Sequence, residues 1–73
     1  MNKNTHILPI IVRMPDVVVM TGISRPTVYR MMKAGTFPHQ IRLSPRIVGW
    51  LRTEVEQWIA DNIAVQRELA QAA

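Results

Sequence analysis

The side chains with the clearest chemistry in this sequence lie between Ser24 and Lys33. The stretch SRPTVYRMMK combines two arginines and a lysine with a serine, a threonine and a tyrosine. Guanidinium groups suit bidentate hydrogen bonds to guanine, ammonium groups suit phosphates, and hydroxyl groups bind either phosphates or base edges. The stretch therefore predicts a surface that binds double-stranded DNA, with the following contact residues: Ser24, Arg25, Thr27, Tyr29, Arg30 and Lys33.

A second cationic group surrounds a proline in the stretch RLSPR, residues 42–46. Arginines beside a rigid turn can neutralise a phosphate or enter a narrow minor groove. An arginine in such a place can also be an ordinary solvated side chain, so this alternative stays open. The DNA-binding interpretation assigns three residues to this second site: Arg42, Ser44 and Arg46.

The sequence offers no set of side chains suited to catalysis or to metal binding. It has no cysteine, and its two histidines, His6 and His39, lack nearby acids. Isolated histidines make a poor metal site. Glu54 and Glu56 are expected on different sides of a helix start, and no glycine-rich phosphate loop is present. We therefore predict a protein without enzymatic activity, catalytic residues, metal or other cofactor.

Charge is distributed unevenly along the chain, which carries a net +4 in total. Residues 1–52 contain eight lysines and arginines and a single acid, Asp16, and so carry +7. Residues 53–73 contain four acids and Arg67, and so carry −3. A basic body joined to an acidic segment favours a polyanionic partner for the body.

Two glycines divide the region around the first cationic cluster into two predicted helices. The first runs from about Pro15 to Thr21 and ends at Gly22, which tolerates the positive φ of a tight turn. Ser24 is the expected N-cap of the second helix, which runs to Ala34 and stops at Gly35. On this helix the apolar stripe at positions 28, 31 and 32 leaves the cationic side chains on another face.

The following residues predict a β-hairpin and a third helix. Residues 40–43 and 46–50 are short strand-like segments with Ser44-Pro45 between them as the turn. The stretch TEVE, residues 53–56, matches a capping box, so a helix starts near Thr53 and continues to about Leu69. The aromatic residues Phe37, Trp50 and Trp58 are expected in the core, because so short a chain needs its large apolar side chains for folding.

The order of these elements is that of a small, mainly α, winged helix-turn-helix domain. We expect a flexible N-terminal arm at residues 1–12, the DNA-binding domain at 13–62, and an extension of the third helix at 63–73. The stretch PIIVR, residues 9–13, is either a brief strand or an extended lead-in. No apolar run is long enough to span a membrane and no signal peptide is recognisable, so a cytoplasmic location is expected.

Residues 13–60 resemble the AlpA family of prophage-type regulators, relatives of phage excisionases with a MerR-like winged helix. The most specific stretches are GTFP, RLSPRIVGW and TEVEQWI. The resemblance implies binding to promoters or attachment sites of mobile elements, with the recognition helix on residues 24–34 and the wing on residues 42–46. The tail after Asn62 lies beyond the shared pattern.

Three functions follow as hypotheses. The first is a sequence-specific transcriptional regulator of a prophage or genomic island that acts on integrase expression. The second is an excisionase that binds and bends attachment-site DNA. The third, from another class, is a protein-interaction adaptor that uses the third helix and binds no DNA. Integrase, RNA polymerase and further copies of the chain on DNA are the protein partners that the DNA-binding hypotheses imply.

Overall fold

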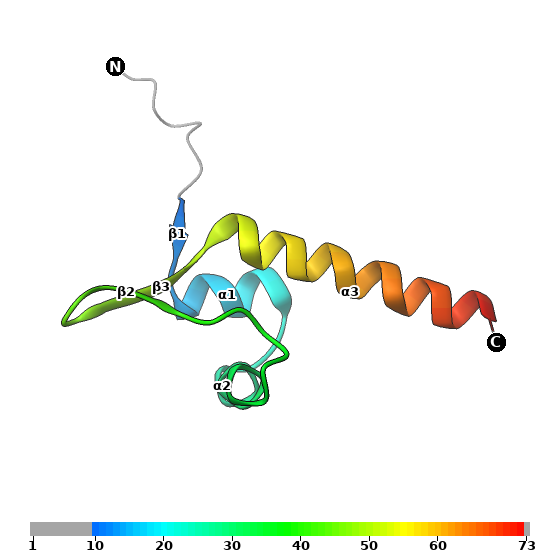
Figure 1. The fold of residues 1–73 in the computed structure, drawn as a ribbon, viewed down its shortest axis with the longest axis horizontal. Helices are drawn as coiled ribbons and strands as arrows, with labels where there is room; N and C mark the ends of the chain where they lie inside the picture. Colours follow the sequence, from blue (N-terminus) through cyan, green and yellow to red (C-terminus); the bar gives the residue numbers. More distant parts are fainter. Residues whose placement is uncertain (1–9, 73) are drawn as a thin grey trace, which may run out of the picture.

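The computed structural model describes residues 10–72, which form three helices and three short strands (Figure 1). The predicted helix-turn-helix, hairpin and third helix are all present, so the fold is a small winged helix-turn-helix, mainly α, as expected. In chain order the elements are β1 Ile11–Val12, α1 Met14–Thr21, α2 Arg25–Ala34, β2 Ile41–Ser44, β3 Ile47–Leu51 and α3 Arg52–Ala72.

The turn between α1 and α2 is fixed by a left-handed glycine and a threonine hydroxyl. Gly22 has a φ of 74°, and its N–H donates to the Val18 carbonyl over 2.8 Å. The Thr21 hydroxyl donates to the Val17 carbonyl (2.7 Å) and accepts the N–H of Ile23 (3.1 Å). Both ends of the turn are thus hydrogen-bonded, which sets the direction in which α2 leaves α1.

The boundaries of α2 agree with the prediction, but its N-terminal cap differs. Ser24 occupies the N-cap position, yet its side chain makes no cap hydrogen bond and instead donates to the Thr27 hydroxyl over 3.0 Å. A capping oxygen normally accepts the N–H of the second or third helical residue, and the second residue here, Pro26, has none. At the other end Gly35 closes the helix with a φ of 80°.

The apolar side of α2 faces the core, as the periodicity predicts. Val28 is completely buried, and Met31 and Met32 are partly buried against the core. The other fully buried side chains are Val17 of α1, Trp50 of β3 and Val55 of α3. The core therefore lies where the three helices meet one face of the small sheet.

The hairpin is present, with its turn one residue later than predicted. Pro45 and Arg46 form the turn, and Ser44 pairs with Ile47. The register shifts between Arg42 and Ser44, so the strand is irregular there. Arg46 consequently lies at the tip of the hairpin rather than in a strand.

A third strand, β1, joins the sheet, and it corrects the predicted boundary of the N-terminal arm. Ile11 pairs with Leu51 and Val12 with Trp50, so the strand order is β1-β3-β2. Val12 is only 2% exposed and belongs to the core, because the sheet buries β-branched side chains well. The arm therefore does not extend to residue 12. The rest of it, residues 1–9, lies outside the described residues.

Close approach of β1 to β3 depends on Gly49. A Cβ atom at this position would lie 2.7 Å from both the Val12 carbonyl oxygen and the Ile11 Cγ2 atom. Only glycine leaves room for β1 at this distance.

The third helix begins directly after β3, one residue before the predicted start. The N–H of Arg52 donates to the Ile10 carbonyl over 2.7 Å, so the strand bonding continues into the first residue of α3. Thr53 therefore lies inside the helix and is not its N-cap, which corrects the capping-box prediction. The helix continues to Ala72, and residues 60–71 are exposed along the part that extends away from the hairpin (Figure 1).

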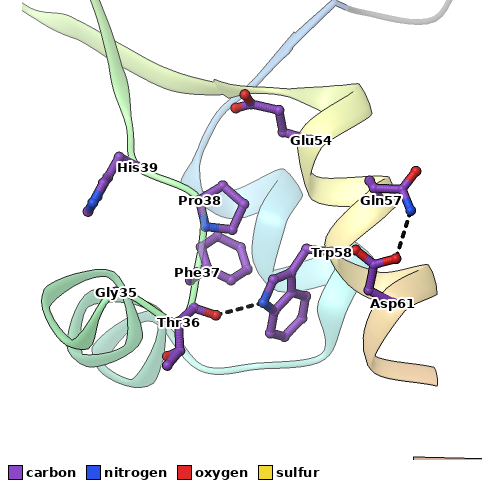
Figure 2. A pocket seen from close by; sticks show the side chains of 9 residues that line it. All are labelled: Gly35, Thr36, Phe37, Pro38, His39, Glu54, Gln57, Trp58 and Asp61. Carbon is purple, nitrogen blue, oxygen red and sulfur yellow. Dashed lines mark hydrogen bonds between the residues drawn. The ribbon is translucent and has the colours of Figure 1, made fainter. Parts of the chain in front are cut away.

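The loop after α2 is held between two tryptophans. Trp50 of β3 donates its indole N–H to the Pro38 carbonyl (2.8 Å), and Trp58 of α3 donates its indole N–H to the Thr36 carbonyl (2.7 Å; Figure 2). Phe37 lies between them, with ring centroids 6.2 Å from Trp50 and 4.8 Å from Trp58, both edge to face. Trp58 is only partly buried, whereas Trp50 is fully buried.

This difference in burial predicts unequal effects of two matching substitutions. Trp50→Phe leaves the Pro38 carbonyl without its donor and opens a void in the core, so it should lower the free energy of unfolding by about 2–4 kcal/mol. Trp58→Phe exposes the Thr36 carbonyl to water, so the loss should be about 1 kcal/mol. Urea denaturation followed by circular dichroism measures both. Equal losses would mean that the two hydrogen bonds hold the loop equally.

Candidate nucleic-acid interface

The predicted contact residues of α2 lie on its outward face. Arg25, Tyr29, Arg30 and Lys33 are all exposed, and Tyr29 keeps 46% of its surface open to solvent despite its apolar ring. They lie on another face of the helix than the buried side chain of Val28, because adjacent positions in a helix point in different directions. The helix therefore carries a cationic, hydroxyl-bearing face that no other described element covers.

The hydroxyl of Thr27 organises the first two turns of this face. It accepts a hydrogen bond from the Ser24 hydroxyl and another from the Arg30 Nη2 atom, each over 3.0 Å. Both partners are three residues away, the spacing at which helical side chains meet. The hydrogen bond holds the Arg30 side chain along the helix surface toward its N-terminus. The pattern S-x-x-T-x-x-R is visible in the sequence, but we had not predicted the interaction.

The wing presents one arginine that is braced and one that is at the tip. The Arg42 Nη1 atom donates to the Pro45 carbonyl over 2.9 Å, so this guanidinium stabilises the turn. Arg46 is exposed in the turn itself, and Ser44 is partly buried at the end of β2. Arg42 therefore has a structural role in addition to its positive charge.

A groove lies between α2 and the sheet. It has a volume of about 380 Å³ and lies where the start of α1, the first half of α2 and the strands meet. Two of the residues that line it, Arg13 and Gln40, are not among the predicted contact residues. Its lining residues are Arg13, Met14, Pro15, Arg25, Tyr29, Gln40, Val48 and Trp50.

Cations on this side of the molecule have no acidic partners within the described residues. Within the described residues, the salt bridge that forms joins Arg52 and Glu56 of α3 over 2.8 Å. The Asp16 carboxylate accepts the backbone N–H of Arg13 over 3.0 Å and forms no salt bridge with a guanidinium. The positive charge of α2 and of the wing is therefore left uncompensated by neighbouring side chains.

Residues 10–72 show neither a metal site nor a membrane-spanning helix. No three or more histidine, cysteine, aspartate or glutamate side chains of this part gather where they could hold a metal ion. Likewise, none of the described helices is long and apolar enough to cross a membrane.

Comparison with known proteins gives one family. The model of the family described as prophage CP4-57 regulatory protein (AlpA) matches residues 10–63, which include the sheet, α1, α2 and the first part of α3. The matched segment leaves out the exposed end of α3.

Two relatives are similar over most of this segment. "Uncharacterized protein ORF88" of Enterobacteria phage P4 is 42% identical over 52 residues, which cover 71% of this chain but only 59% of the phage protein. The "DNA-binding transcriptional activator AlpA" of Escherichia coli (strain K12) is 32% identical over 58 residues, covering 71% of this chain and 83% of the relative. No solved structure matches the chain. The family match and the extent of these two similarities establish that the chain belongs to the AlpA family of prophage regulatory proteins.

Proposed function

We propose that this protein is a sequence-specific DNA-binding transcriptional regulator of a prophage or genomic island, acting in the cytoplasm without catalysis. The observation that carries the proposal is the outward face of α2, where four exposed side chains with three positive charges have no acidic partner among the described residues. Membership of the AlpA family supports it, and so does the similarity to the Escherichia coli relative, which is named a DNA-binding transcriptional activator.

In the proposed complex α2 lies in the major groove and α1 crosses the DNA backbone behind it. Arg25 and Arg30 carry the groups that suit guanine O6 and N7. Arg30 is the better base reader of the two, because the hydrogen bond from its Nη2 atom to Thr27 already restricts its side chain. A restricted side chain loses less conformational entropy when it binds.

The remaining contacts of α2 concern the DNA backbone. Lys33, at the end of the helix, suits a phosphate because its ammonium group is a flexible point charge. Ser24, Thr27 and Tyr29 supply hydroxyl groups that bind phosphate oxygens or base edges. Together they fix the register in which the arginines meet the bases.

The wing contributes affinity through charge. Arg46 at the hairpin tip neutralises a phosphate or enters the minor groove, while Ser44 adds a hydroxyl group beside it. Arg42 supports this contact indirectly, because it holds the turn that presents Arg46.

The regulated gene is proposed to be that of an integrase, with RNA polymerase as the protein partner at the promoter. The same interface would also serve an excisionase, which bends attachment-site DNA and cooperates with integrase, aided by neighbouring copies on the DNA. A bending assay with circularly permuted duplexes separates these two roles. Strong bending together with stimulation of excision would favour the excisionase, and promoter activation without bending would favour the regulator.

Removal of the Arg30 side chain should weaken specific binding. Because Arg30 is proposed to read a base, Arg30→Ala should cost about 1–3 kcal/mol on a duplex selected from a random library, with a much smaller loss on random DNA. Fluorescence anisotropy with both duplexes measures this. Thr27→Val is the companion variant, since it keeps Arg30 but removes its hydrogen bond, and it should cause a smaller loss. Unchanged affinity in a folded Arg25→Ala/Arg30→Ala double variant would refute base reading by α2.

Removal of the Arg46 side chain should weaken specific and random DNA by similar factors. Loss of one phosphate contact should reduce the slope of log affinity against log salt by about one unit. Arg67→Ala is the matched control, because this exposed arginine lies on the part of α3 that extends away from the hairpin (Figure 1). An Arg46→Ala variant that loses only the selected duplex would mean that the wing reads sequence.

The adaptor alternative makes the opposite prediction about salt. Its surface would be the exposed end of α3, where Ile63 is 46% and Leu69 is 59% exposed. Binding to a protein partner that survives high salt and needs Ile63 and Leu69, without affinity for any duplex, would replace the DNA-binding proposal.

A further inference from the structure

We propose that the groove between α1, α2 and the sheet binds one phosphodiester of the DNA backbone, with Arg13 and Arg25 as its cationic ligands. The inference rests on the proposed DNA binding. It assigns Arg25 to the DNA backbone, which leaves base reading on α2 to Arg30. It makes Arg13, which precedes the helix-turn-helix, a part of the interface.

The groove has the chemistry that a phosphodiester and its sugars require. Arg13 and Arg25 contribute guanidinium groups, and Tyr29 and Gln40 add a hydroxyl group and an amide. Pro15 and Val48 supply an apolar lining that is open to solvent. Guanidinium groups bind phosphate oxygens with paired hydrogen bonds, and the apolar surface suits the deoxyribose on either side. The volume of about 380 Å³ exceeds that of a phosphate alone and leaves room for these sugars.

Both arginines are available for such a ligand. They are exposed, and neither side chain forms a salt bridge with any described residue. No acidic side chain of the described residues lines the groove, so its positive charge is not neutralised from within. Two guanidinium groups beside one hollow repel each other, and an anion between them removes that repulsion.

The position of the groove points to the DNA backbone rather than to a free anion. A phosphodiester strand separates the major from the minor groove of DNA. A helix in the major groove and a wing at the adjacent minor groove or backbone must therefore straddle one strand. The groove is lined by Arg25 of α2 and by Val48 of β3, the strand that follows the wing. It consequently faces the strand that they straddle.

The backbone of Arg13 is fixed before any DNA arrives. Its N–H donates to the Asp16 carboxylate, and its carbonyl accepts the N–H of Val17 over 3.0 Å. The preceding residue, Val12, is paired with Trp50 in the sheet. Arg13 therefore differs from a residue of a free arm, because its Cα position is set by β1 and α1 together.

The test compares Arg13→Gln with the parent on a duplex selected from a random library. A set of duplexes with single neutral methylphosphonate linkages, one position at a time, locates each phosphate contact. We expect one linkage at the edge of the major groove to reduce the affinity of the parent by about tenfold, as the loss of a charged hydrogen-bonded contact does. Arg13→Gln should lose about the same factor on the unmodified duplex, with a salt slope lower by about one unit.

The decisive result is the combination of variant and modified duplex. At the linkage that Arg13 contacts, Arg13→Gln should lose less affinity than the parent does, because only Arg25 remains there, while at all other linkages the losses should add. Arg13→Lys should keep the salt slope, because it retains the charge. Arg67→Gln should behave as the parent at every linkage, and thermal melting of each variant checks the fold.

Two other outcomes overturn the proposal in different ways. If the parent binds DNA but Arg13→Gln binds equally well, or loses the same factor at every linkage, the groove does not hold a phosphate and the proposed function stands. If the folded parent has no affinity for any duplex, the proposed function fails, and the groove proposal fails with it.

Discussion

The placement of α2 depends on the loop of residues 36–38, whose carbonyl groups at Thr36 and Pro38 accept hydrogen bonds from two tryptophans. Val28 is the one residue of α2 that is fully buried, so side-chain packing alone gives this helix a weak hold on the core. The turn at Gly22 fixes where the helix begins. Its far end is fixed because Trp50 binds the Pro38 carbonyl and Trp58 binds the Thr36 carbonyl, on either side of Phe37. The loop thus ties α2 to both β3 and α3.

These hydrogen bonds matter because the positive charges on the outward face of α2 repel one another and destabilise the helix. Arg30 and Lys33 are three residues apart on a short helix, and like charges at this spacing destabilise it. The acids of the chain do not compensate, because they are concentrated on α3, where Glu56 pairs with Arg52 and Asp61 accepts a hydrogen bond from Gln57. A bound polyanion relieves this repulsion. The same distribution of charge therefore destabilises the free protein and stabilises its complex with DNA.

Local signals made most of the fold predictable from sequence. Gly22, Gly35 and Pro45 mark turns whose chemistry is contained in a few neighbouring residues. The pairing of β1 with β3 was not predictable in the same way, because Ile11 and Leu51 are far apart in the chain and the room for their approach depends on Gly49. The same holds for the candidate site: the cationic face of α2 follows from helical periodicity, whereas the groove at Arg13 exists only after three separate elements have come together. Ser24 is the N-cap as predicted but makes no side-chain cap hydrogen bond, since Pro26 has no N–H to give. The helix predicted to start near Thr53 begins at Arg52, because the strand bonding continues into that residue.

Trp50 connects the core with the proposed interface. Its indole N–H donates to the loop after α2, its backbone pairs with Val12, and the residue borders the groove that contains Arg13 and Arg25. Arg13 directly follows the residue that pairs with Trp50, so the pairing of β1 with β3 also sets where the backbone of Arg13 lies. A phosphate in the groove would therefore meet an arginine whose backbone is already fixed, and its binding would cost less ordering of the protein. On this view the stability of the domain and the geometry of its DNA contacts depend on the same buried residue.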